Sequence, residues 1–525
     1  MGCVVIQGAN CGPAICYTIP VDMKSRSIPL AFLVFAAAFC ARADVTLPQI
    51  LAEHMVIQRG QPVHVWGKAS PDETVTVAFR GATQSTKADP LGRWSVSLAP
   101  GDAGGPFDLT VKGNNTIAFK DVLVGDVWVA SGQSNMEFKL RQADNAMAEI
   151  AAAKYPKIRR TLIDRKVADY PMEDATGQPW MDVNPENAAG ASAVAYFFAR
   201  HLQEKLGGVP IGIIETFWGG TPVEAWMSLR GIGSDPALMP IFSEWAKAEE
   251  AWPVAQANYE KQLANWKTVS AAAKTSGATV PPQPAMPNLR PDGPFVPAGL
   301  YNGMIAPFTQ YPIKGAIWYQ GETNANANPN GASLYGRAFG QMIRDWRRAW
   351  GEGDFPFLFV QLANYKANPA WADLREAQRQ TLSLANTGMA VTIDIGNPDN
   401  VHPTNKQDVG LRLALAARVV AYGERIEDSG PVFSHAARED TALRVWFDHT
   451  TGGLKAKSGA LKGFEIAGAD RKFAAADARV DGASILLSNA TVTTPVYVRY
   501  AWADNPDCNL YNGEGLPASP FRSAE

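Results

Sequence analysis

One serine in this chain follows a pattern that can present a nucleophile. An apolar run, residues 127–130, leads into a turn of small residues that ends in Gly-Gln-Ser-Asn, residues 132–135. The hydroxyl of Ser134 is a poor nucleophile unless a base and oxyanion donors converge on it. A serine in this position also has an ordinary alternative role as the N-cap of a helix.

The chain offers a base for Ser134 in the segment Asp-Asn-Val-His-Pro, residues 399–403. His402 would remove the proton of Ser134, while Asp399 would hold the imidazole in the required tautomer and stabilise its charged form. This histidine alone is expected in a loop after a parallel strand. The other five are expected elsewhere: His54 and His64 in the N-terminal β-sandwich segment, His201 in a helix, and His435 and His449 in C-terminal strands. The pattern predicts a hydrolase with Ser134, His402 and Asp399 as its catalytic residues.

The acid partner of His402 has two competitors. Asp394 is expected at a strand end, and Asp408 lies six residues after the histidine. We prefer Asp399 because a spacing of three residues lets both side chains turn inward within one loop.

Regular elements must position these residues, and the sequence between them alternates strands with helices. Buried strands are expected at residues 127–130, 211–215, 313–319, 355–362 and 389–394. Helices are expected at residues 147–154, 192–206, 335–350, 374–384 and 406–422. This alternation is what a parallel sheet with helical crossovers requires. The candidate segments fall where strands end, which is where ligands bind in open parallel sheets.

Short β-rich runs with turn residues flank this α/β region. Residues 44–124 are predicted to form an N-terminal β-sandwich, and residues 431–525 a C-terminal β region. The region between them, residues 125–430, contains a helical, tryptophan-containing insertion at about residues 237–290. The two β regions fit either one shared accessory unit or two separate ones.

The chain begins with an extension and a segment that is typical of a secretory signal, together residues 1–43. A basic start at Met23 is followed by an apolar run from Ile28 to Cys40 and by small residues before Asp44. The run is too short to span a membrane. We therefore expect initiation at Met23 and a mature protein in the periplasm or outside the cell.

Composition excludes several classes of function. The chain has 525 residues, of which 46% are hydrophobic and 19% charged, as in a well-cored protein of two or three domains. Loss of residues 1–43, with three basic residues and one acid, changes the net charge from −3 to −5. No basic segment remains to bind nucleic acid or an anionic membrane.

Cysteine and metal-binding patterns are also missing from the expected mature chain. Four of the five cysteines precede residue 44, which leaves Cys508 alone and excludes an intrachain disulfide or a Cys-based zinc site. There is no His-Glu-x-x-His motif and no phosphate loop. We expect neither a metal nor a cofactor.

Four blocks of the sequence resemble SGNH-type carbohydrate esterases, in particular the sialate O-acetylesterase family. Residues 132–135 and 399–402 resemble the first and last blocks, and residues 218–226 and 317–325 lie between them in the family's order. The closing segment 510–517 also matches. Gly-Gln-Ser-Asn replaces the Gly-Asp-Ser-Leu of the broader group, and Gln-Gly-Glu-Thr-Asn replaces Gly-x-Asn-Asp, as is typical of the carbohydrate-esterase branch.

The resemblance implies a fold and an activity. The fold is an SGNH-hydrolase-like parallel sheet flanked by helices, with accessory β-sandwich regions similar to jelly rolls. The activity is removal of O-acetyl groups from sugars through an acyl-enzyme. The substrate would be acetylated sialic acid or a plant cell-wall polysaccharide such as xylan or xyloglucan.

An oxyanion hole is expected around the nucleophile. The backbone N–H groups of Ser134 and of Gly219 or Gly220 are natural donors, although the glycine pair also fits a simple tight turn. Gln320 is the preferred third donor and Asn324 the alternative.

Three further side chains are predicted to bind substrate: Glu322, Asn324 and Trp218. Glu322 fits equally well as a support for the nucleophile turn or as a purely structural residue. The neighbouring aromatic residues suit a surface on which a sugar ring stacks; they are Trp226, Trp318 and Tyr319. Aromatic rings at strand ends, however, more often belong to the hydrophobic core.

Two other function classes stay open. One is a carbohydrate-binding protein without catalysis, and the other is a serine hydrolase of lipids or peptides.

Overall fold

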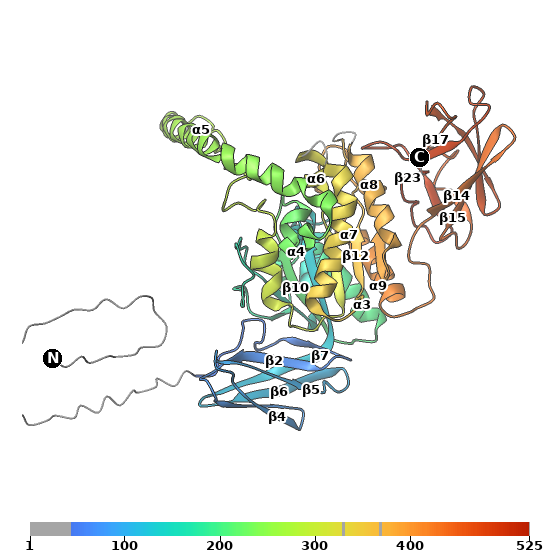
Figure 1. Cartoon of the computed structure of the whole chain (residues 1–525). Coiled ribbons are helices and arrows are strands. Elements are labelled where there is room, and N and C mark those ends of the chain that lie inside the picture. Colours follow the sequence, from blue (N-terminus) through green and yellow to red (C-terminus); the bar gives the residue numbers. More distant parts are fainter. Residues whose placement is uncertain (1–43, 328–330, 367–369, 524–525) are drawn as a thin grey trace, which may run out of the picture. The chain divides into compact units, whose positions relative to one another are not determined.

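The computed structural model describes residues 44–327, 331–366 and 370–523 of the chain (Figure 1). The predicted signal segment, residues 1–43, lies outside the described residues. Within the part that is described, no helix has both the length and the apolar character needed to cross a membrane.

The longest strand, β7 (Thr116–Gly132), belongs to two regions at once and can be followed in Figure 1 from the N-terminal β region into the central sheet. Its first part alternates apolar and polar residues and pairs antiparallel with β6 (Gly104–Lys112). Its second part is buried on every residue, as expected of a strand covered on both faces. The predicted boundary at residues 124 and 125 therefore falls within one continuous strand.

The central sheet has the order β13-β12-β11-β7-β10-β8-β9. All neighbours are parallel except β8 and β9. Its other strands are β8 (Tyr155–Leu162), β9 (Met181–Val183), β10 (Ile211–Phe217), β11 (Gly315–Tyr319), β12 (Phe357–Val360) and β13 (Thr387–Ala390). The five predicted strands are all present, although β13 starts two residues before the predicted range of 389–394 and ends at Ala390, four residues short of its end.

Strand β8 was not among the predicted strands, because its two adjacent arginines give it the pattern of an exposed segment. The structure buries both of them against carboxylates. Arg159 donates to Asp121 over 2.9 Å, and Arg160 donates to Glu215 over 3.0 Å. Paired charges of this kind enter a sheet without leaving an uncompensated ion.

Helices cover both faces of the sheet, and two tryptophans show which helix lies on which face. Trp318 on β11 pairs in register with Ser131, three residues along β7 from Trp128, so the two rings point to opposite faces. Trp128 packs against Phe198 of α3 (Ala193–Lys205). Trp318 packs against Phe339 of α7 (Gly331–Trp350).

The other two long helices of this region join these layers. Helix α9 (Lys406–Val420) packs along α3, and α8 (Ala370–Gln380) packs along α7. The short elements are α1 (Ser134–Glu137), α2 (Ala146–Ala152), α4 (Leu229–Gly233), α6 (Glu322–Ala327), single turns at Leu140–Gln142, Ala188–Gly190, Val223–Trp226, Pro236–Leu238, Ala306–Phe308 and Thr381–Ser383, and a π turn at Tyr301–Ile305. The predicted α/β class is confirmed.

The two accessory β regions are separate. The N-terminal one consists of β1 (Val56–Gln58), β2 (Val63–Lys68), β3 (Thr74–Phe79), β4 (Ala82–Lys87) and β5 (Arg93–Leu98) together with β6 and part of β7. It shares one hydrophobic core with the central sheet. The C-terminal one has its own core. Among the described strands, none of the first region pairs with a strand of the second.

The C-terminal region contains two four-stranded antiparallel sheets and one two-stranded sheet. Its strands are β14 (Val432–Glu439), β15 (Ala442–Asp448), β16 (Leu454–Ala456), β17 (Phe464–Ala467), β18 (Ala474–Ala475), β19 (Asp477–Asp481), β20 (Ser484–Ser488), β21 (Tyr497–Tyr500), β22 (Leu510–Asn512) and β23 (Phe521–Arg522). The insertion at residues 237–290 contains the 37-residue helix α5 (Pro240–Ser276), which buries only Ser270 and Ala273.

Candidate active site

Ser134 and His402 lie in contact although 268 residues separate them in the sequence. The His402 Nε2 atom is 2.7 Å from the Ser134 Oγ atom, and both side chains are partly buried. The N-cap of α1 is Gln133, so Ser134 is the first residue within the helix and does not fill the N-cap role that was its alternative. This geometry allows the imidazole to take the hydroxyl proton.

The turn before Ser134 is held tightly against the neighbouring strand. Gly132 has a φ of 135°, and a Cβ there would lie 2.2 Å from the backbone oxygen of Tyr319. The next residue, Gln133, donates its N–H to that oxygen over 3.0 Å. The Gln133 side-chain oxygen accepts from the N–H groups of Gly321 and Thr323, both over 3.3 Å. The close approach explains why glycine precedes the nucleophile.

The structure does not bring the Asp399 carboxylate to His402. Its side chain is 80% exposed and forms an ion pair of 3.0 Å with Lys366. In the described part of the chain, His402 Nδ1 has no hydrogen-bond partner, and the loop is held instead by the His402 N–H, which donates to Asn400 Oδ1 over 2.9 Å. The role of Asp399 as the orienting acid stays a prediction.

The two competing acids are engaged elsewhere. Asp394 forms a two-pronged ion pair with Arg412, with distances of 2.6 and 2.9 Å, and also accepts from the hydroxyl of Tyr511 over 3.1 Å. Asp408 accepts from the side chain of Asn405 over 2.8 Å at the start of α9. Neither carboxylate contacts His402.

The expected oxyanion donors differ in their availability. The Gly219 N–H donates to Glu137 Oε2 over 2.9 Å, so it is already occupied. Gly219 nevertheless lies beside the nucleophile, because a Cβ on it would be 3.2 Å from the Cβ of Ser134. Within the described structure the N–H groups of Ser134 and Gly220 donate to no protein acceptor. These two groups are therefore the free backbone donors among those predicted.

Gln320 and Asn324 face inward, not toward a substrate. The Gln320 side chain is fully buried, and its Nε2 donates to the Thr221 backbone oxygen over 3.1 Å and to Asn324 Oδ1 over 2.7 Å. Asn324 Oδ1 also accepts from the Val223 N–H, and its Nδ2 donates to Glu224. Both hydrogens of the Gln320 amide are thus used within the protein. The predicted roles of Gln320 as an oxyanion donor and of Asn324 as a substrate ligand stay untested.

Glu322 is buried as well, with 4% of its surface exposed. Its Oε1 atom accepts from Asn135 Nδ2 over 2.6 Å, directly beside the nucleophile. Burial raises the pKa of this carboxyl, and the hydrogen bond from Asn135 opposes that change. Of the three interpretations that the sequence left open, the geometry favours support of the nucleophile turn over contact with sugar hydroxyls.

The electrostatic environment favours the neutral form of His402. Burial lowers the pKa of the imidazole, and the nearby ammonium of Lys406 lowers it further. A neutral imidazole is the form that accepts a proton from serine.

Known proteins that are similar to this chain are carbohydrate esterases. Residues 295–421 match the family described as carbohydrate esterase, sialic acid-specific acetylesterase. The chain is 31% identical to the sialate O-acetylesterase of Homo sapiens over 87% of this chain and 88% of that protein. It is 30% identical to the sialate O-acetylesterase of Mus musculus over 89% of this chain and 92% of that protein. The chain belongs to the sialate O-acetylesterase family.

This family member is a carboxylic ester hydrolase, as predicted. It is also similar to a solved carbohydrate acetylesterase from Xanthomonas citri, with 41% identity and a TM-score of 0.78. The similarity covers 92% of this chain and all of that one, 100%.

One pocket of the esterase, of about 800 Å³, is lined by Trp218 but by neither Ser134 nor His402. Trp218 lines it together with Arg165 and with Trp252 of the inserted helix α5. The Arg165 guanidinium lies 5.4 Å from the centre of the Trp218 ring and forms an ion pair with Glu137. The other predicted rings, Trp226, Trp318 and Tyr319, are buried in the core.

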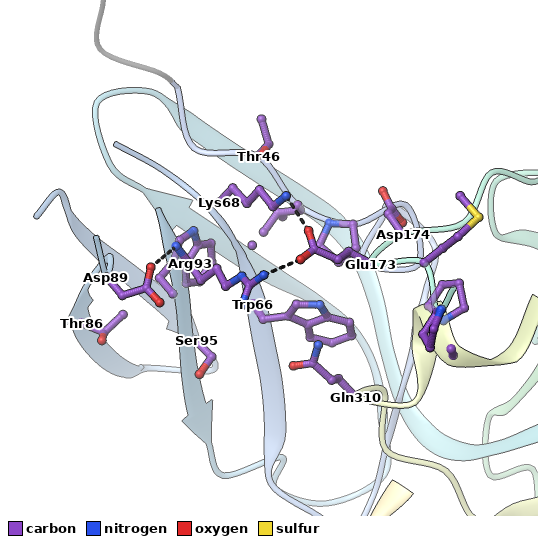
Figure 2. Close-up of a pocket in the computed structure, with 18 of the residues that line it drawn as sticks. Thr46, Trp66, Lys68, Thr86, Asp89, Arg93, Ser95, Glu173, Asp174 and Gln310 are labelled. Carbon is purple, nitrogen blue, oxygen red and sulfur yellow. Dashed lines mark hydrogen bonds and ion pairs between the residues drawn. The ribbon is translucent and has the colours of Figure 1, made fainter. Parts of the chain in front are cut away.

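Another pocket, of about 790 Å³, lies beside strands β2 and β5 and does not include the catalytic residues. Figure 2 shows Glu173 between Lys68 and Arg93, and both ion pairs measure 2.6 Å. The two cations are thus already paired with one carboxylate.

Among the described residues, one group has the composition of a metal site: Glu427, Asp428 and His449. His449 Nδ1 lies 2.8 Å from Glu427 and 3.5 Å from Asp428. Glu427 also accepts from the Thr451 N–H over 3.2 Å. These contacts already form a local charge cluster, and none of its members is a predicted catalytic residue. Cys508 is a free thiol.

Sequence reasoning missed three residues of the site. Glu137 holds the Gly219 segment, Asn135 binds the Glu322 carboxylate, and Lys406 lies buried near His402. Asn135 and Glu137 were visible as near neighbours of Ser134. Lys406 gave no signal, because a lysine at the start of a helix usually lies in solvent.

Proposed function

We propose that this esterase removes O-acetyl groups from carbohydrates through an acetyl-enzyme formed on Ser134. The observation that carries the proposal is the 2.7 Å contact between His402 Nε2 and Ser134 Oγ. Family membership supports the acetyl group and the sugar alcohol as the two halves of the ester.

In the first half of the reaction, His402 accepts the Ser134 proton while Oγ attacks the acetyl carbonyl carbon. The carbonyl oxygen becomes an oxyanion, and the free N–H groups of Ser134 and Gly220 are the proposed donors to it. The intermediate then expels the sugar oxygen, which takes the proton from His402. The products of this half are the free sugar hydroxyl and acetylated Ser134.

In the second half, water replaces the sugar. His402 accepts a proton from the water, whose oxygen attacks the acetyl carbon of the acyl-enzyme. Collapse of this second intermediate releases acetate, and the proton on His402 returns to Ser134 Oγ. The cycle needs no oxidant, reductant or metal.

Asp399 is the acid that we propose for orienting His402 through its free Nδ1 atom. The ion pair that holds Asp399 away is exposed on both sides, with 62% of the Lys366 side chain and 80% of the Asp399 side chain accessible. Exposed pairs of this kind are generally worth about 0–1 kcal/mol. Rotation of the Asp399 side chain toward the imidazole therefore meets little electrostatic resistance, whereas Asp394 would have to leave Arg412, which is largely buried.

The substrate is proposed to be an acetylated sialic acid or an acetylated hemicellulose. The enzyme is proposed to act on it outside the cytoplasm. Trp218, Trp252 and Arg165 line a pocket that suits a hydroxyl-rich leaving group. Trp218 directly precedes Gly219, which lies beside Ser134. The secretory pattern in residues 1–43 supports export.

Acetate release from a panel of acetylated sialic acid, xylan and xyloglucan tests the proposal, with the Ser134→Ala variant as the control. A fluorophosphonate probe that labels the wild type and not this variant separates an enzyme from a carbohydrate-binding protein. Faster cleavage of long-chain esters than of acetates would favour a lipid hydrolase instead.

A further inference from the structure

A lysine lies fully buried at the start of α9, four residues after His402. The Lys406 Nζ atom donates to Asn135 Oδ1 over 2.6 Å. It lies 4.9 Å from the ring centre of Phe138 and 5.1 Å from that of Tyr319. Among the described residues it forms no ion pair with a carboxylate. Burying an ammonium without such a pair is costly, so its position calls for an explanation.

Asn135 connects this lysine to three other parts of the site. Its Nδ2 donates to Glu322 Oε1 over 2.6 Å and to the backbone oxygen of Val401 over 2.9 Å. The orientation of the amide follows from its partners, because an ammonium only donates and both a carboxylate and a carbonyl only accept. Asn135 follows Ser134 directly, and Val401 precedes His402 directly. One buried amide thus joins the nucleophile turn to the loop of the base.

Lys406, Asn135 and Glu322 form a hydrogen-bonded line, in which Glu322 lies on the side of Asn135 opposite Lys406. Glu322 is the first residue of α6, and only one of its two carboxylate oxygens has a partner among the described residues. The buried line therefore has a cation at one end, a carboxyl at the other and a single amide between them. Its three members come from three elements, α9, α1 and α6.

We propose that Lys406, Asn135 and Glu322 form a buried positioning unit that fixes the His402 loop against the nucleophile turn, and that Lys406 is the member on which the arrangement depends. The inference rests on the proposed serine-esterase mechanism and adds a requirement to it. Lys406 acts through Asn135 and Val401 and does not touch the reacting atoms.

The charge of Lys406 has a second consequence for the same histidine. The ionisable groups that face it are Glu322 on α6, Tyr319 on β11 and His402 on its own loop. Burial lowers the pKa of Lys406 to about 7, and Glu322 opposes that change. Because an adjacent cation disfavours a second cation, a charged Lys406 keeps His402 in its proton-accepting form.

Two substitutions separate the hydrogen bond from the charge. Lys406→Met keeps the length of the side chain but removes both, whereas Lys406→Gln removes the charge and keeps a donor for Asn135. Both should move the acid limb of kcat/KM to higher pH, because the cation that lowers the His402 pKa is lost. Lys406→Met should also lower kcat about 10- to 100-fold with KM nearly unchanged, since a displaced base costs rate and not binding.

Lys314→Met is the matched control. Lys314 lies just before β11, at the end of that strand away from Ser134, and its Nζ is 4.9 Å from the ring centre of Tyr422. The same substitution therefore removes a lysine from an aromatic ring at a similar distance but outside the site. It should leave both kcat and the pH profile as in the wild type.

The measurements are kcat, KM and their pH dependence with 4-nitrophenyl acetate, together with NMR titration of His402 in each folded full-length variant. Lys406→Met with wild-type kcat and pH profile would overturn the proposal. If Lys406→Met does not fold, an unshifted His402 titration in Lys406→Gln overturns it. An active Ser134→Ala variant would instead reject the serine mechanism, and the NMR titration still reports on Lys406 in that case.

Discussion

The Glu137 carboxylate holds the backbone of Gly219, accepting its N–H over 2.9 Å beside the nucleophile. The same carboxylate pairs with Arg165, which lies against the ring of Trp218. Glu137 therefore ties the segment after β10 to the helix that begins with Ser134.

Replacement of Glu137 should loosen that segment. We expect Glu137→Ala to lower kcat/KM for an acetylated sugar about tenfold or more, because small displacements near a reacting centre are costly. Glu137→Gln should lose less, since its side-chain oxygen still accepts the Gly219 N–H. Equal losses in the two variants would show that the ion pair of Glu137 with Arg165, and not the backbone contact, is what matters.

Gly132→Ala should destabilise the whole protein. The new Cβ would lie 2.2 Å from the Tyr319 backbone oxygen, at a residue whose φ is 135°. We expect the free energy of unfolding to fall by more than about 1 kcal/mol, as measured by denaturant titration. Gly233→Ala in α4 is the control, because a Cβ there meets nothing within 4 Å. Equal stability of the two variants would contradict the tight packing of the turn.

The pH dependence should reflect His402. The imidazole must be neutral to accept a proton, so kcat/KM is lost as pH falls through its pKa and is complete above it. Burial and Lys406 hold that pKa below its ordinary value of 6.5. Measurement of kcat/KM from about pH 4 to pH 9 should therefore place the midpoint of a single rising limb below 6.5. A midpoint above that value would contradict the described environment.

Asp399→Asn tests the orienting acid. We expect kcat to fall about 100-fold or more, because an amide cannot stabilise the imidazolium in the same way. Asp394→Asn should instead lower the melting temperature, since it weakens the pairing of the largely buried Arg412. A loss below threefold in Asp399→Asn would point to a Ser134–His402 pair that works without a carboxylate.

The residues whose position follows from the order of strands and helices could be predicted from the sequence. The hydrogen bonds and ion pairs that depend on the direction of a side chain could not. Ser134 and His402 could be predicted because each follows a strand, and the ends of parallel strands share one edge of a sheet. The spacing of Asp399 and His402 placed both in one loop but did not reveal that the carboxylate turns to Lys366. Strand β8 and Lys406 were missed for a common reason, since charged residues are expected in solvent until their partners are known.

The most direct test of the account is acetate release by Ser134→Ala. Among the described residues, His402 is the one hydrogen-bond partner of the Ser134 hydroxyl, so removal of the hydroxyl should leave the melting temperature nearly unchanged. Because no other group can form the acetyl-enzyme, kcat should fall by about three orders of magnitude or more. A folded Ser134→Ala variant that releases acetate within about tenfold of the wild-type rate would contradict Ser134 as the nucleophile.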